Sequence, residues 1–146
     1  MDNTDIQMLK ILQGDGRITL SDLSKKLALS RPSVSERLTR LFEKGIIDKI
    51  SARVILSSIG RDILLFIQVS DISISYNEFE KMIIGHPDII ECHRVTGNVN
   101  YLLKAAVSDM DHLSNLIDEL IPFGNISTSI VLKSLVEDGH LQPIIK

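Results

Sequence analysis

Hydrophobic positions in the first third of the chain repeat at helical spacing. The first apolar stripe predicts a helix that ends at Gly14 (Ile6, Met8, Leu9, Ile11 and Leu12). A second helix begins behind a Thr19 N-cap and is expected to face inward through four side chains (Leu20, Leu23, Leu27 and Ala28). A third begins behind Ser30, carries Pro32 in its first turn and stops at Gly45 in a left-handed C-cap.

After Gly45 the pattern becomes that of strands. The segment "IIDKISARVIL", residues 46–56, predicts one or two short strands that lead into a linker around 57–60. The remainder alternates between strand and helix signals, with segments at 62–70, 77–85, 89–96, 100–108, 110–122 and 126–136. This βαββαβ order predicts a four-stranded antiparallel sheet with two helices on one face, and an α+β fold overall.

Charge also divides the chain into two modules. Residues 1–60 carry ten Lys and Arg against seven Asp and Glu, whereas residues 61–146 carry six against twelve. A basic front and an acidic back favour a front module that faces a polyanion. We therefore expect a helix-turn-helix domain over 1–49, a strand and linker over 50–61, and a ferredoxin-like domain over 62–146.

Composition is that of an ordinary globular protein, with 44% hydrophobic and 24% charged residues. No apolar run approaches the roughly 20 residues that cross a bilayer. The polar start "MDNTDIQ" is not a secretory signal, and one cysteine forms no internal disulfide. We expect a cytoplasmic protein with no membrane association.

The third helix concentrates the chemistry. Residues 29–47 contain four basic side chains, three serines and a proline. At about 100° per residue one side is apolar and is expected to face the core (Val34, Leu38, Leu41 and Phe42), while polar and basic residues gather on the opposite flank with Glu36 beside them (Ser33, Arg37, Arg40 and Lys44). A thin polar helix start and exposed guanidinium groups suit a helix that enters the DNA major groove. The alternative is a solvated charged face in which Glu36 and Glu43 are local partners.

The ordered set of motifs resembles the Lrp/AsnC (leucine-responsive/asparagine regulator) family of bacterial and archaeal transcription factors. The N-terminal part of the resemblance rests on Asp5 to Leu12, "DGRI" at 15–18, "LS" at 29–30, and the segment from Arg37 to Ile47. The C-terminal part rests on "HPDIIECHRVTGNVNYLL" and "STSIVL". The resemblance covers the chain essentially end to end.

The resemblance implies a winged helix-turn-helix joined to a ferredoxin-like module for ligand binding and assembly. It implies binding to double-stranded DNA by homodimers that often stack into octamers of four dimers. Carried onto this chain, the DNA-binding residues are Ser30, Arg31, Ser33, Arg37 and Arg40. We expect Arg37 and Arg40 to contact DNA, Ser30 and Ser33 to start the helix and hold phosphate, and Val34 to be core. On this interpretation Arg37→Ala weakens DNA binding and leaves the melting temperature nearly unchanged.

The family commonly binds an amino acid beside a Thr-Gly-x-Tyr-Asp loop. The corresponding residues here are Gly97, Asn98, Asn100, Tyr101 and Thr128. The chain departs from the family pattern because Val99 and Asn100 replace the Tyr-Asp pair, and Ile126 replaces the first threonine of the closing strand. Neutral Asn100 is a weaker partner for an ammonium group than a carboxylate. The sequence therefore leaves open whether the chain binds an amino acid, a different ligand or none.

Enzymatic alternatives find little support in the sequence. The four histidines and Cys92 show no zinc-ligand spacing, and no P-loop, GxSxG or dinucleotide glycine pattern is present, so we predict no metal, no cofactor and no catalytic residues. Tetrapyrrole decarboxylases of haem synthesis are similar to this family, and His93 with Arg94 is the adjacent pair that would serve such an enzyme. A protein–protein module without a DNA role is a further alternative, but it does not explain the serine-rich, arginine-lined helix.

Overall fold

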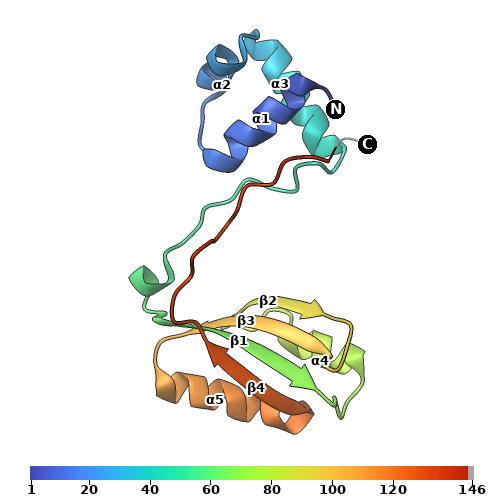
Figure 1. The fold of residues 1–146 in the computed structure, drawn as a ribbon, viewed down its shortest axis with the longest axis vertical. Coiled ribbons are helices and arrows are strands. Elements are labelled where there is room, and N and C mark those ends of the chain that lie inside the picture. The colour runs from blue at the N-terminus through green and yellow to red at the C-terminus, as the bar shows by residue number, and fades with distance from the viewer. Residues whose placement is uncertain (145–146) are drawn as a thin grey trace. The chain divides into compact units, whose positions relative to one another are not determined.

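The computed structural model describes residues 1–144 and divides into two units (Figure 1). The first unit comprises Met1–Arg53 together with the segment from Val136 onward, and the second comprises Val54–Leu135. The sequence had assigned everything after residue 61 to one module. The contacts of the last segment, which lie with the first unit, were not visible in its local pattern.

Three helices build the first unit: α1 (Asn3–Gly14), α2 (Leu20–Leu27) and α3 (Arg31–Glu43). Each begins at a side chain that accepts a hydrogen bond from a backbone N–H of the first turn, namely Asp2, Thr19 and Ser30. Gly45 has φ +64°, and the backbone N–H groups of Gly45 and Ile46 reach back to carbonyls of α3. The caps predicted at Thr19, Ser30 and Gly45 are therefore confirmed.

The core of the first unit joins all three helices through Met8, Leu23, Leu27, Val34 and Leu41, which are buried. Val34 is core, as predicted. The expectation was wrong for three other side chains. Leu20 is 43% exposed and Phe42 is 38% exposed, because both lie at the edge of their apolar stripes, and Ala28 is an exposed left-handed C-cap of α2.

Residues 46–55 form no strand in the described chain, contrary to the prediction of one or two short strands there. A β-branched segment becomes a strand only where a neighbouring strand completes its backbone hydrogen bonds, and among residues 1–144 no strand pairs with this one. The backbone N–H groups of Ile46 and Ile47 donate instead to the carbonyl of Leu41. Arg53 forms ion pairs with Glu137 and, at 3.0 Å, with Asp138 of the last segment, which Gln13 of α1 also contacts through two hydrogen bonds with the backbone of Leu141.

The second unit has the predicted βαββαβ order. After a short 3₁₀ turn (Leu56–Ile59), its elements are β1 (Ile63–Ser70), α4 (Tyr76–Ile83), β2 (Ile89–Arg94), β3 (Tyr101–Val107), α5 (Met110–Leu120) and β4 (Asn125–Ile130), with a second 3₁₀ turn, η2 (Ile121–Phe123), before β4. The sheet order is β2-β3-β1-β4 and every pairing is antiparallel. The last strand ends at Ile130 rather than near residue 136, because only Val131 bonds further to β1, through the carbonyl of Leu64.

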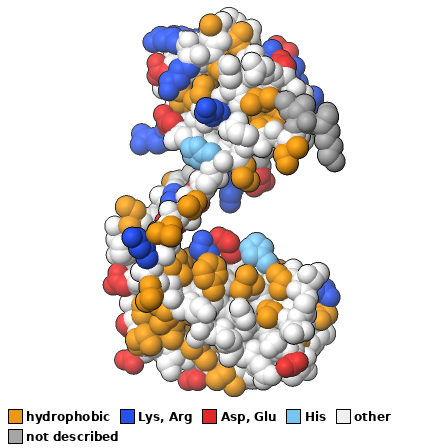
Figure 2. Space-filling model, viewed as in Figure 1, with side chains coloured by type: hydrophobic (Ala, Val, Ile, Leu, Met, Phe, Trp, Pro, Cys, Tyr) orange, Lys and Arg blue, Asp and Glu red, His pale blue; other side chains and the backbone are white. Residues whose placement is uncertain are grey.

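Alternation along the strands gives the sheet two different faces. Leu65, Ile67 and Val69 of β1 point to the face that α4 and α5 cover, where they meet Phe79 and Leu116. The intervening positions of β1 and β3 point to the uncovered face, which is partly apolar (Leu64, Phe66 and Leu102). In Figure 2 hydrophobic side chains gather on the surface of this unit. No helix within residues 1–144 is both long and apolar enough to cross a bilayer.

Candidate nucleic-acid interface

The N-terminus of α3 is built by hydroxyl groups. Ser30 Oγ accepts a hydrogen bond from the backbone N–H of Ser33 at 3.3 Å and lies 2.9 Å from Ser33 Oγ. Pro32 occupies the first turn, where no donor is lost. Arg31 reaches back to α2, because its Nη2 donates to Ser21 Oγ at 2.8 Å. The helix-start role of Ser30 is confirmed, and three of the predicted DNA-binding residues lie together at this end.

Arg37 does not lie on the open flank that the sequence predicted. Its Nη1 donates to Asp2 Oδ2 at 2.6 Å and to Asp5 Oδ1 at 2.8 Å, and its side chain is 24% exposed. Asp5 is buried. Burial raises the pKa of Asp5, but hydrogen bonds from the backbone of Asp2 and from Arg37 outweigh burial and hold that pKa below its usual range. Arg37 therefore joins α3 to α1, and the expectation that its removal leaves stability unchanged is corrected.

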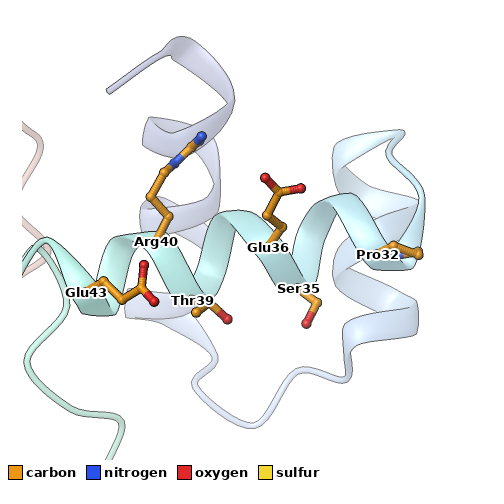
Figure 3. A pocket seen from close by; sticks show the side chains of 6 residues that line it. All are labelled: Pro32, Ser35, Glu36, Thr39, Arg40 and Glu43. Carbon is orange, nitrogen blue, oxygen red and sulfur yellow. The ribbon is translucent and has the colours of Figure 1, made fainter.

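The outward face of α3 is made by a different set of residues. It carries a shallow hollow lined by Pro32, Ser35, Glu36, Thr39, Arg40 and Glu43 (Figure 3). At about 100° per residue these positions lie opposite the buried side chains of Val34 and Leu41, whereas Arg37 lies beside the core. The sequence had predicted that the basic flank with Arg37 and Lys44 faces outward. Measuring the angle from the centre of the apolar stripe would have identified Ser35, Glu36 and Thr39.

Arg40 is the predicted arginine that stays accessible. Its side chain is 41% exposed, and its Nη2 lies 3.5 Å from Asp5 Oδ1, a long contact at the limit of hydrogen bonding. Glu36, one turn earlier, points from the same side of the helix (Figure 3). Within residues 1–144 neither Glu36 nor Glu43 forms an ion pair, so the charged face is not neutralised by the local partners that the alternative interpretation required.

The loop between β2 and β3 contains three of the predicted effector-binding residues. Gly97 has φ +105°, in the left-handed region that favours glycine, and Asn98 is exposed beside it. Asn100 is engaged at both ends of its amide. Its Nδ2 donates to the hydroxyl of Tyr76 at 3.2 Å, and its Oδ1 accepts from the backbone N–H of Ile72 at 3.4 Å.

The other two predicted effector residues, Tyr101 and Thr128, lie on strands rather than in the loop. Tyr101 is 1% exposed and donates its hydroxyl to Glu80, so its ring is part of the core. Burial, followed by this hydrogen bond, raises the pKa of Tyr101 to about 12. Thr128 lies on β4, which β1 separates from β3. Tyr101 directly follows Asn100, and its ring lies 5.9 Å, centroid to centroid, from that of Tyr76, the partner of Asn100. The strand order therefore separates Thr128 from the loop, whereas Tyr101 adjoins it.

The histidines take structural positions. His112 Nε2 lies 2.8 Å from Asp88 Oδ2, and Arg61 Nη1 lies 2.6 Å from the other oxygen of the same carboxylate. Burial raises the pKa of Asp88, but the hydrogen bonds from Arg61 and His112 lower this pKa by more than burial raises it. The pKa of Asp88 therefore lies below its usual range. His93 Nε2 lies 3.3 Å from Glu91 Oε2 on the same strand. Among the residues that the structure describes, no group of three His, Cys, Asp or Glu side chains could hold a metal ion.

Two family models together span nearly the whole chain. Residues 64–141 match the Lrp/AsnC ligand binding domain, and residues 1–48 match a winged helix-turn-helix DNA-binding domain. The chain belongs to the Lrp/AsnC family. The Lrp/AsnC resemblance, the α+β fold and the assignment as a DNA-binding transcriptional regulator are thereby confirmed.

Individual Lrp/AsnC proteins are similar over nearly their full length. The uncharacterized HTH-type transcriptional regulator YezC of Bacillus subtilis is 34% identical over 134 residues, covering 92% of this chain and 95% of YezC. A transcriptional regulator from Neisseria meningitidis, solved as a complex with L-methionine, is 29% identical with a TM-score of 0.90, over 97% of this chain and 96% of that one. A feast or famine regulatory protein from Mycobacterium tuberculosis, also complexed with L-methionine, is 26% identical with a TM-score of 0.86, over 97% and 99%.

These relatives also decide between the regulator and the enzyme. YezC and the Neisseria meningitidis protein are named as transcriptional regulators and the Mycobacterium tuberculosis protein as a regulatory protein, none as an enzyme, which confirms the prediction that this Lrp/AsnC chain is a regulator rather than an enzyme.

Proposed function

We propose that this Lrp/AsnC regulator binds double-stranded DNA by placing the outward face of α3 in the major groove. The observation that carries the proposal is that this face, from Pro32 to Glu43, is largely exposed. Among the described residues its side chains make one ion pair with the rest of the first unit, the long contact from Arg40 to Asp5, and the face follows directly on a capped helix start. A helix-turn-helix presents its second helix to the groove in this way, with the N-terminal residues nearest the bases. DNA binding also implies that the protein acts in the cytoplasm.

The contact residues that the geometry supports differ in one position from the predicted set. Ser30, Arg31 and Ser33 lie at the helix start, where free N–H groups and the helix dipole favour a phosphate. Arg40 contributes an accessible guanidinium for phosphate or guanine. Arg37 acts through Asp5, by holding α1 against α3, and is a positioning residue.

We also propose that the second unit assembles the protein as homodimers and as an octamer of four dimers. The support lies in the uncovered sheet face, where Phe66 is 39% exposed beside Leu64 and Leu102. Antiparallel sheets with a solvated face alternate apolar and polar positions, whereas this face keeps apolar side chains on both central strands. Dimers of this kind would place two copies of α3 on one side of the duplex, about one helical turn or its multiples apart.

An L-amino acid is the proposed effector class. Two similar structures are complexes with L-methionine, and in this chain the loop at 97–100, whose Gly97 and Asn98 are exposed, is the place we propose for such a ligand. A second copy of the chain would complete the site, because Tyr101 is buried and Thr128 lies on a strand that does not adjoin the loop. Calorimetry with L-methionine and with the pooled amino acids tests the proposal, with Asn100→Asp expected to strengthen binding of the ammonium group. Absence of heat, together with an unchanged molecular mass, would refute the effector role.

DNA binding is tested by fluorescence anisotropy on the DNA upstream of the protein's own gene and on a random duplex, each over a salt series. We expect tighter binding to the upstream DNA. The logarithm of the binding constant should fall linearly with the logarithm of the salt concentration, with a slope of several units. Arg40→Gln is expected to weaken binding, while Lys81→Gln, the loss of an exposed charge in the second unit, is not. No binding to either duplex at low salt would refute the proposal.

A further inference from the structure

We infer that Glu36 is a specificity-determining residue that reads a cytosine in the major groove. The inference rests on the proposed DNA binding by α3 and names the base that one side chain of that helix selects.

Glu36 occupies the middle of the surface that meets DNA. It is exposed, lies opposite the buried Val34 and Leu41, and lines the hollow on the outward face of α3 (Figure 3). Pro32 lies one turn before it and Arg40 one turn after it on the same face. A carboxylate at this place is brought close to the base edges in any complex that uses this face.

The carboxylate of Glu36 has no partner within the described chain. Arg40, one turn later on the same face, has its ion pair with Asp5 at 3.5 Å, and the ion pairs of Arg37 are with Asp2 and Asp5. Neither a hydrogen bond nor an ion pair to Glu36 is found in residues 1–144. The carboxylate is therefore free to accept hydrogen bonds from a ligand.

An unpartnered negative charge opposes binding to phosphates at every DNA sequence. Only a base that donates a hydrogen bond offsets this cost. Cytosine presents its N4 amino group as a donor on its major-groove edge, whereas guanine presents acceptors, thymine presents an acceptor and adenine sets an acceptor beside its donor. The chemistry of Glu36 therefore selects cytosine and disfavours guanine and thymine.

The chain contains a matched control. Glu43 lies on the same outward face at the opposite end of α3, away from the N-terminal turns that reach the bases. Glu36→Gln and Glu43→Gln remove the same charge and keep the same side-chain length. Both variants should bind random DNA more tightly, but only the first should change base preference.

Selection of full-length protein on a randomised duplex library, followed by anisotropy on single-base variants, tests the inference. The wild type should prefer cytosine at one position by about 5- to 150-fold. Glu36→Gln should move that preference to adenine, because a glutamine side chain bonds adenine through both N6 and N7. Glu43→Gln should select the wild-type sequence. Far-UV circular dichroism verifies that each variant is folded.

The outcomes distinguish base selection by Glu36 from DNA binding by α3. If Glu36→Gln selects the same base as the wild type at every position, or if the wild type binds duplex DNA with no cytosine preference at any position, Glu36 is a solvated side chain and the inference is overturned while DNA binding stands. If the wild type binds no duplex at low salt, the proposed function fails and the inference fails with it.

Discussion

Arg37 Nη1 lies 2.8 Å from Oδ1 of Asp5, a carboxylate whose side chain is only 5% exposed. Arg37 belongs to α3 and Asp5 to α1, so this ion pair joins the proposed recognition helix to α1 within the first unit. Asp2 Oδ2 accepts from the same nitrogen of Arg37. Asp2 Oδ1 accepts from the backbone N–H of Asp5, and the backbone N–H of Asp2 donates to Asp5 Oδ2, which closes the capping box of α1. The cap of one helix and the orientation of another therefore depend on one guanidinium group.

Replacing Asp5 by Asn should lower the free energy of unfolding of the first unit by about 1 to 3 kcal/mol, because a buried charge-assisted hydrogen bond is lost. Arg37→Ala should also lower its stability, since it leaves the Asp5 carboxylate buried without its cation. Amide hydrogen exchange in α1 and α3 measures this, because both tyrosines lie in the second unit and do not report on the first. Arg31→Ala, which loses a single bond to a hydroxyl, is the control and should change little.

The contribution of Asp5 should depend on pH. Its pKa in the folded protein lies below its unfolded value, so the stabilisation is complete above the unfolded pKa and is lost as pH falls through the folded pKa. The difference in stability between the wild type and Asp5→Asn should therefore be constant near neutral pH and shrink below about pH 4. Urea unfolding followed by amide exchange between pH 7 and 3 measures it. A difference that stays constant to pH 3 would contradict the ion-pair account.

The second unit has a comparable anchor in Asp88, which Arg61 and His112 contact at 2.6 and 2.8 Å. Asp88→Asn should lower the stability of this unit by about 1 to 3 kcal/mol, because the carboxylate is nearly buried and both partners are left less well satisfied. Tyrosine fluorescence during urea unfolding reports on this unit alone. Asp118→Asn, at an exposed position of α5, is the control and should leave the unfolding midpoint nearly unchanged.

Assembly through the uncovered sheet face predicts a sensitive position at Phe66. Phe66→Lys should lower the molecular mass of the particle in solution, because it places a charge among the apolar side chains of that face. Light scattering after size exclusion measures the mass. Met110→Lys, which changes an exposed hydrophobic residue at the start of α5, should leave it unchanged. Equal masses for the wild type and Phe66→Lys would place the interface elsewhere.

The sequence by itself determined most of the fold. Helix boundaries could be predicted from Thr19, Ser30 and Gly45 because capping is a local interaction between neighbours in the chain. The strands could be predicted from alternation, as in "ILLFIQVS", because one covered face imposes a period of two. The βαββαβ order of elements is compatible with few sheet topologies, and the four-stranded antiparallel sheet is one of them.

Strand formation outside the sheet could not be predicted in the same way. Residues 46–55 and 131–136 have strand-like composition, but no strand pairs with the first segment in the described chain, and the second has one bond to β1. A strand is completed by a neighbour, so its local pattern is a necessary condition and not a sufficient one. The pairing of Arg53 with Asp138 is likewise a contact between segments far apart in sequence.

The candidate interface shows the same division. The sequence identified α3 as the helix that carries the chemistry, because its start signals and its apolar stripe are local. Only the tertiary structure decided which of its side chains are free. Arg37 is taken by Asp5, thirty-two positions earlier, while Glu36 remains without a partner in the described chain. Charges on a helix are visible in the sequence, but the long-range packing that brings another charge within 3 Å depends on the folded chain.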